Sequence, residues 1–347
     1  MLNELASAPT DTDVYLGQPR EIVSGVYRLR MPLPFRLNHI NLYLLEDAAG
    51  WTLIDCGLNR SDVLSLWQEV IAERLGGKPI TRIVVTHLHP DHIGLAHALQ
   101  GLTGAPVFMT RREWRLAQDV FNLPLTNATW IEQHYRRLGL EGESLQAVAR
   151  QASGYRRLVK ELPTDIHYLH EHETLDIGGR HWRILFGSGH SPAGACLWDE
   201  SDRLLIAGDH ILPSITSNIN LLSVGPTNPL DEYLTSLRTF RALPCALLLP
   251  AHGSPVVSYH ERIEELIRHH EQRLDLLRAA CQEPRTAADC VPILFSGNLP
   301  VHQYFFAIGE SASHLVYLSE HGNLRMDGEF PWRFAVSIAG ANGGRVS

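Results

Sequence analysis

The chain has 347 residues, of which 44% are hydrophobic and 20% are charged, a composition typical of soluble globular proteins. Its formal net charge of -8 gives no general attraction to nucleic acid or to an anionic membrane. No apolar run is long enough to span a bilayer, and residues 1–17 lack the apolar core of a secretory signal. We therefore expect a cytoplasmic protein. The five cysteines form no CxxC pair, which favours reduced thiols.

The first third of the chain predicts strands alternating with helices. Residues 1–20 are predicted to form a loosely held N-terminal arm. Aliphatic and β-branched runs predict strands at 26–29, 40–45, 51–54, 80–86 and 106–109. A helix capped by Ser61 is expected to end at Gly76-Gly77, and a second helix runs from about Ile93 to Gly101.

The stretch between the fourth strand and the second helix carries four side chains that bind metals in proteins: His87, His89, Asp91 and His92. It forms a loop at the end of a rigid strand. Imidazole and carboxylate ligands suit zinc, iron or manganese. The absence of cysteine argues against a closed structural zinc site. Three histidines and an aspartate in such a short loop predict a metal site.

Residues 111–163 differ from the segments on either side, because their apolar residues recur at helical spacing and no strand pattern interrupts them. This segment is predicted to be a helical insertion between two strands. Two interpretations stay open. It is either a packing elaboration or a lid or wall over the metal site that sets substrate choice.

Strand patterns return after the insertion, and several of these strands are followed by a histidine or an aspartate. The strands are expected at 173–177, 182–186, 195–198, 204–207 and 246–250. The residues that follow strands are His190, Asp209 and His252, and Asp55 follows an earlier strand. This repetition is what a metal site built from several loops should show.

The composition changes after Pro255. A long amphipathic helix is predicted at 259–281, and Thr286 caps a short helix at 287–294. A further helix at 300–321 and strands at 324–326 and 332–334 complete a predicted winged-helix unit over 258–337. The long helix and this unit are candidates for a homodimer interface, and residues 338–347 are expected to be a disordered tail.

Taken together, the loops resemble the metallo-β-lactamase-fold hydrolase superfamily. Its HxHxDH signature matches residues 87–92, and the resemblance spans roughly residues 23–255. The remaining matches are His190 in the third loop, the bridging Asp209, the last histidine His252 and the early Asp55. The resemblance implies an α+β fold, an αββα sandwich over residues 21–257 with the helical insertion at 111–163. The C-terminal part resembles the winged-helix domain attached to some members.

The resemblance also implies a dinuclear centre, with zinc the foremost candidate and iron or manganese as alternatives. One divalent ion would take His87, His89 and His190, and the other would take Asp91, His92 and His252. Asp209 would bridge the two ions together with a hydroxide. Asp91 is the candidate catalytic residue, orienting the hydroxide and carrying a proton to the leaving group. Asp55 is expected beside the ligands, orienting a histidine.

Four functions are compatible with such a centre. The leading one is hydrolysis of a small-molecule thioester, ester or lactone by a metal-bridging hydroxide. Glyoxalase II-type members carry a second histidine where this chain has Ala193-Gly194-Ala195, so glutathione thioesters are not favoured. A nuclease or phosphodiesterase is disfavoured because residues 286–324 hold no lysine or arginine. The third function is that of a mononuclear iron persulfide dioxygenase, and the fourth is that of a non-catalytic regulatory metalloprotein.

The chain has 19 histidines, more than any metal site requires. Those outside the strand-end loops are interpreted as non-ligands. His210, next to Asp209, is a weak candidate for lining the site. His269 and His270 are predicted to lie on the solvated face of the long helix.

Overall fold

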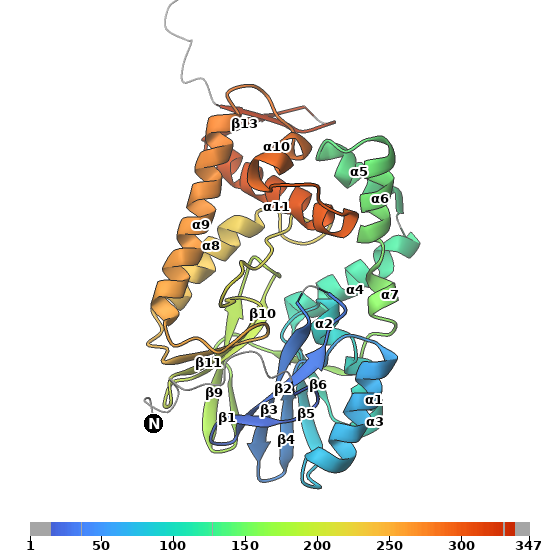
Figure 1. Cartoon of the computed structure of the whole chain (residues 1–347), viewed down its shortest axis with the longest axis vertical. Helices are drawn as coiled ribbons and strands as arrows, with labels where there is room; N and C mark the ends of the chain where they lie inside the picture. Colours follow the sequence, from blue (N-terminus) through green and yellow to red (C-terminus); the bar gives the residue numbers. More distant parts are fainter. Residues whose placement is uncertain (1–14, 36, 127, 329, 337–347) are drawn as a thin grey trace, which may run out of the picture.

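The computed structural model describes residues 15–35, 37–126, 128–328 and 330–336. The predicted disordered tail and most of the predicted N-terminal arm lie outside these residues. Within them, no helix is both long enough and apolar enough to cross a membrane. Two sheets stand side by side in the lower half of Figure 1, and helices lie above them and to their right.

The first sheet begins as an antiparallel meander and continues with parallel strands. Its order follows the sequence, from β1 to β7. Strands β1 to β4 pair antiparallel, whereas β4, β5, β6 and β7 pair parallel. The strands are β1 (Arg20–Val23), β2 (Val26–Pro32), β3 (His39–Asp47), β4 (Gly50–Ile54), β5 (Ile80–Val84), β6 (Val107–Thr110) and β7 (Ile166–Leu169).

The second sheet has the order β12-β11-β10-β9-β8. Strands β11 and β12 pair parallel, and the remaining neighbours pair antiparallel. Its strands are β8 (Thr174–Ile177), β9 (Arg180–Gly187), β10 (Gly194–Asp199), β11 (Leu204–Gly208) and β12 (Leu247–Pro250).

The two sheets pack face to face, and alternation along each strand explains how. In β11, Leu204 and Ile206 enter the core between the sheets, while Leu205 and Ala207 enter the core beneath the helices. In β5, Val84 faces the other sheet and Ile83 faces the opposite way. Successive side chains of a strand point to opposite faces, so a strand buried on both faces is apolar throughout.

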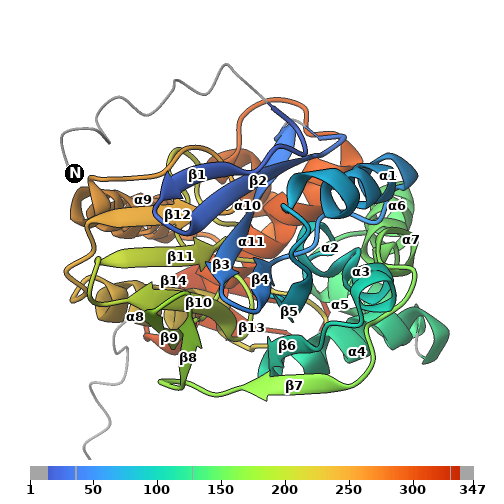
Figure 2. The ribbon, with the colours of Figure 1, turned by 90° about the horizontal axis from the view of Figure 1, so that it is seen from below.

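Helices cover the outer face of each sheet, as Figure 2 shows from below. The helices that precede the second sheet are α1 (Ser61–Glu69) with its π-helical extension η2 (Val70–Arg74), α2 (Pro90–Ile93), α3 (Ala96–Thr103), α4 (Arg111–Thr126), α5 (Ala128–Arg137), α6 (Gly142–Ala152) and α7 (Tyr155–Leu158). The later helices are α8 (Pro229–Phe240), α9 (Tyr259–Ala280), α10 (Ala287–Leu294) and α11 (Val301–Glu320). Helices α5 and α6 pack against each other, and α6 packs against α11 instead of a sheet. The α+β, αββα sandwich expected from the sequence is confirmed.

Helices α10 and α11 are followed by the hairpin β13 (Leu324–Asp327) and β14 (Arg333–Val336). The predicted cap of α10 is present, since Thr286 and Asp289 form a reciprocal capping box. The order of helix, helix and hairpin is as predicted, whereas the winged-helix assignment and the domain boundaries stay predictions.

Two local predictions are wrong. Ser61 is the first residue of α1 instead of its cap, because Arg60 occupies the cap position with extended backbone. His270 is fully buried, and its Nδ1 lies 3.0 Å from Nε2 of His314 on α11. Helix α9 packs against both α8 and α11, so its buried face is wider than the apolar stripe alone suggests.

Candidate metal centre

The predicted ligands come together at one edge of the sandwich. They follow the C-terminal ends of β5, β9, β11 and β12, and the pairing directions place these ends on the same side of their sheets. Backbone hydrogen bonds join the two sheets there. The Ala195 amide donates to the Thr86 carbonyl at 2.8 Å, and the Asn41 amide donates to that of Ala251 at 2.7 Å.

Seven side chains form two groups that could each hold a metal ion. The ligand atoms within each group lie within 4.8 Å of one another. The first group is His87, His89, His190 and Asp209, and the second is Asp91, His92 and His252. All seven residues proposed from the sequence are therefore brought together.

Asp209 belongs to the first group and also faces the second. Its Oδ2 is 3.6 Å from Nε2 of His190 and 3.5 Å from Nε2 of His92. Its Oδ1 is 3.4 Å from Nε2 of His252, which is in turn 3.3 Å from Oδ2 of Asp91. One carboxylate thus faces histidines of both groups, as a bridging ligand must.

Three histidines are held by their other ring nitrogen. Nδ1 of His92 lies 2.8 Å from Asp55 Oδ2, Nδ1 of His190 lies 2.9 Å from the Asn218 carbonyl, and Nδ1 of His252 lies 3.2 Å from the His39 carbonyl. Such contacts set the tautomer and the ring orientation, and they direct Nε2 toward the site.

Asp55 is buried and has a left-handed backbone, with a φ of 63°. Aspartate tolerates this conformation better than most residues, and such backbone is frequent at functional sites. Its Oδ1 accepts a hydrogen bond from the Thr86 amide at 2.7 Å, so the carboxylate connects the start of the ligand loop to His92. This is the place beside a histidine that the sequence predicted.

The donor set fits divalent cations. Among the described residues, Nε2 of His92, Nε2 of His190 and Oδ1 of Asp209 are buried and accept or donate no hydrogen bond. Buried polar atoms nearly always have partners, so three orphaned ligand atoms facing one another indicate a missing partner at this place. Nitrogen and oxygen donors of this kind suit zinc, iron and manganese alike.

The electrostatics of the second group favour a positive charge there. Burial lowers the pKa of His252, but the carboxylates of Asp209 and Asp91 outweigh it and raise that pKa to about 10. Burial raises the pKa of Asp91, but His92 and His252 outweigh it and lower that pKa to about 2. Metal ions compete with protons for such ligands, so a cation bound here would displace protons from the histidines.

Sequence reasoning missed several residues around the site. Glu113 and Tyr155, from the helical insertion, hydrogen-bond to the ligand loops. Glu113 stands among charged residues at the start of an amphipathic helix, where the sequence offers no sign of burial. His210 lines a small cavity with His87, His190 and Asp209, in keeping with its weak prediction.

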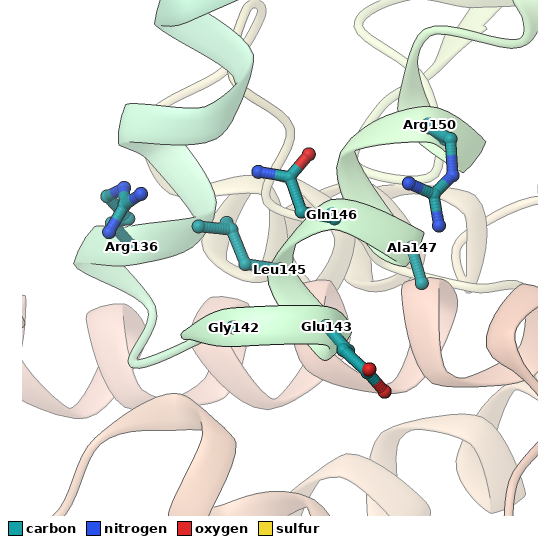
Figure 3. A pocket seen from close by; sticks show the side chains of 7 residues that line it. All are labelled: Arg136, Gly142, Glu143, Leu145, Gln146, Ala147 and Arg150. Carbon is teal, nitrogen blue, oxygen red and sulfur yellow. The ribbon is translucent and has the colours of Figure 1, made fainter.

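A larger, shallow pocket lies away from this centre, between α5 and α6. Figure 3 shows Gln146 between Arg136 and Arg150, whose guanidinium groups lie on opposite sides of it. The two arginines do not converge on one point. None of the candidate ligands lines this pocket.

A sequence profile of the metallo-beta-lactamase superfamily matches residues 36–252. The chain belongs to this superfamily. A second profile, of the metallo-beta-lactamase-like C-terminal domain, matches residues 274–337. The match covers all four ligand-bearing loops, so this member of the superfamily is a metallo-hydrolase with a candidate metal site.

Known relatives are similar to this metallo-beta-lactamase superfamily member over most of its chain. A crystal structure of a beta-lactamase domain protein from Burkholderia ambifaria is 37% identical, with a TM-score of 0.86 over 94% of this chain and 96% of that one. The probable metallo-hydrolase YqjP of Bacillus subtilis is 26% identical over 84% of this chain and 91% of its own. The atrochrysone carboxyl ACP thioesterase of Aspergillus fumigatus is 23% identical over 74% and 66%, respectively.

Proposed function

We propose that this metallo-hydrolase is dinuclear and hydrolyses a small organic thioester, ester or lactone. The observation that carries the proposal is the position of Asp209 between two complete ligand groups. His87, His89 and His190 would hold one ion, Asp91, His92 and His252 the other, and Asp209 both. Zinc is the first candidate, with iron or manganese as alternatives. When bound, two such ions would supply a hydroxide nucleophile at neutral pH and would polarise the substrate carbonyl.

The protein's own residues have distinct tasks in this scheme. Asp91 is the candidate proton carrier, because its carboxylate lies at the site and its pKa is low enough to keep it ionised at neutral pH. Oδ2 faces His92 and His252 and would bind the ion, so Oδ1 would accept a proton and return it to the departing thiol or alcohol. Asp55 would hold His92 in one orientation through Nδ1.

Three features favour a small organic substrate. Loops beside the candidate ligands expose apolar side chains, with Phe35 and Leu37 just before His39 and Ile215 just after Asp209. Residues 286–324 lack lysine and arginine, which a phosphate-binding track would need. A thioesterase is among the relatives of the chain. A cytoplasmic location, a homodimer, and the absence of nucleic-acid and membrane partners remain predictions.

The test combines metal content with hydrolysis of an acyl-CoA, an acyl-glutathione, a homoserine lactone, nitrocefin, bis-p-nitrophenyl phosphate and a short RNA. We expect about two metals per chain and activity on at least one of the first three compounds. His89→Ala and Asp91→Ala should abolish that activity. His181→Ala and Asp176→Ala are matched controls, because these two side chains are 76% and 79% exposed and pair with each other at the surface.

The remaining outcomes decide against the proposal. Cleavage of the phosphodiester or RNA alone would identify a nuclease or phosphodiesterase. One iron per chain without hydrolysis would favour the persulfide dioxygenase. A protein that binds no metal after reconstitution would favour a non-catalytic regulatory or interaction protein that has kept the fold.

A further inference from the structure

Glu113, on the first turn of α4, has its carboxylate buried between two ligand-bearing loops. The side chain is fully buried. Its Oε2 accepts a hydrogen bond from the Leu88 amide at 3.1 Å, and its Oε1 accepts one from the Ala193 amide at 2.7 Å. Leu88 lies between His87 and His89, and Ala193 lies three residues after His190. One carboxylate therefore connects the loop that supplies His87, His89, Asp91 and His92 with the loop that supplies His190.

Two neighbouring side chains hold the same two residues from the other side. The hydroxyl of Tyr155, on α7, donates to the Leu88 carbonyl at 2.6 Å. The hydroxyl of Thr110, at the end of β6, donates to the Ala193 carbonyl at 2.9 Å. The amide and the carbonyl of Leu88 and of Ala193 are thus all bound by side chains from residues 110–155.

This arrangement joins the two sheets at the metal centre. The loop with Leu88 follows β5 of the first sheet, and the loop with Ala193 lies between β9 and β10 of the second. An isolated buried carboxylate is costly, and hydrogen bonds from backbone amides offset that cost. Both carboxylate oxygens of Glu113 accept such a hydrogen bond. The position of Glu113 therefore depends on both loops, and the positions of the two loops depend on Glu113.

The two ligand groups are held by different means. Glu113 contacts Leu88, between His87 and His89, and Ala193, in the loop of His190, and these three histidines belong to the first group. In the second group, His92 is held by Asp55 and His252 by the His39 carbonyl. Loss of Glu113 should therefore affect one ion more than the other.

We propose that Glu113 is a positioning residue that sets the separation between the His87–His89 loop and His190. The helical insertion then builds one half of the metal centre, beyond any role as a cover. This inference rests on the proposed dinuclear function. It names no new ligand, because Glu113 faces backbone amides instead of the ions.

The test compares Glu113→Gln with wild-type protein. The carboxamide keeps one oxygen, but its NH2 group faces a backbone amide that is also a donor, so one of the two loop contacts is lost. We expect one zinc ion to bind about 10–100-fold more weakly, as for other residues that orient metal ligands, and the second to change less than about threefold. Tyr155→Phe should shift the same ion in the same direction by a smaller factor. Glu143→Gln, at an exposed position of α6, is the matched control and should change neither.

Two readouts are independent of turnover. Zinc titration of the apo-protein against a chromophoric chelator resolves the two affinities, and the visible spectrum of the cobalt-substituted protein reports which coordination sphere changes. Amide hydrogen exchange of the apo-protein should rise at peptides containing Leu88 and Ala193 in Glu113→Gln, but not at peptides containing His252.

The outcomes separate this inference from the proposed function. A wild-type chain that binds no zinc would refute both. A wild-type chain that binds two ions, with Glu113→Gln binding both equally well, would refute only the positioning role. Equal weakening of both ions together with a lower melting temperature would show that Glu113 supports the fold in general, which also overturns the inference. If Glu113→Gln fails to fold, the Tyr155→Phe titration decides.

Discussion

Replacing Arg273 by methionine should strongly destabilise the folded chain, because Arg273 forms a buried ion pair with Glu310. Its Nη1 lies 2.7 Å from Oε1 of Glu310, and the two side chains are only 15% and 5% exposed. The other oxygen of Glu310 accepts a hydrogen bond from Nδ2 of Asn218 at 2.7 Å. Burial already raises the pKa of Glu310, whereas Arg273 lowers it.

The magnitude follows from what the substitution leaves behind. Removing one partner of a buried ion pair leaves an uncompensated charge, which costs about 3–5 kcal/mol. Arg273→Met keeps most of the apolar stem, so lost packing contributes little. In Arg273→Met/Glu310→Gln the uncompensated charge is gone and an acceptor for Asn218 remains. We therefore expect the double variant to recover about 2 kcal/mol or more of that loss.

Urea unfolding at pH 7.5 measures these differences through the transition midpoint and slope. The matched control is Arg278→Met on the same helix, whose ion pair with Asp275 is 47% and 72% exposed. An exposed pair contributes about 0–1 kcal/mol. The reasoning is refuted if Arg273→Met lies within about 1 kcal/mol of that control, or if the double variant is no more stable than the single one.

Two further predictions concern buried histidines. Burial lowers the pKa of His134 to about 4, and its ring lies 3.0 Å from the Leu221 carbonyl. The imidazole of His134 takes up a proton at a higher pH in the unfolded chain than in the folded one. The free energy of unfolding should therefore fall as pH drops from about 6.5 toward 4, with ~2 kcal/mol lost between pH 8 and 5. His134→Gln should lose that part of the pH dependence in urea unfolding at both pH values, and an unchanged dependence would contradict the assignment. Asp55→Asn should weaken zinc binding about 10–100-fold through His92, and a chelator titration that matches wild type would exclude this role.

Much of the candidate metal centre could be predicted because each ligand lies in a segment of a few residues after a strand whose own pattern is clear. The run Ile83-Val84-Val85 predicts a buried strand, and β5 indeed ends at Val84, just before the loop of His87. Local signals of this kind need no knowledge of distant neighbours. The capping box at Thr286 could be predicted for the same reason, since both of its partners lie within one helical turn.

The residues that support the ligands could not be predicted in this way. Glu113 is buried because two loops, one of them 80 residues away, direct their amides toward it. His270 is buried because His314 packs against it from a helix that follows 44 residues later. A charged or polar residue on an amphipathic helix carries no mark of such a partner, so its sequence context indicates solvent.

His190 is connected both to the helical insertion and to the C-terminal helix α11. Its loop is held through Ala193 by Glu113 of the insertion. Its Nδ1 is held by the carbonyl of Asn218, whose side chain is in turn held by Glu310 of α11. Both added segments therefore reach the first ligand group at His190, and the insertion also contacts Leu88 between His87 and His89. The second group depends on Asp55 and His39 within the sandwich itself. Because small displacements of a ligand change metal affinity, changes in either added segment could tune one ion while leaving the other in place.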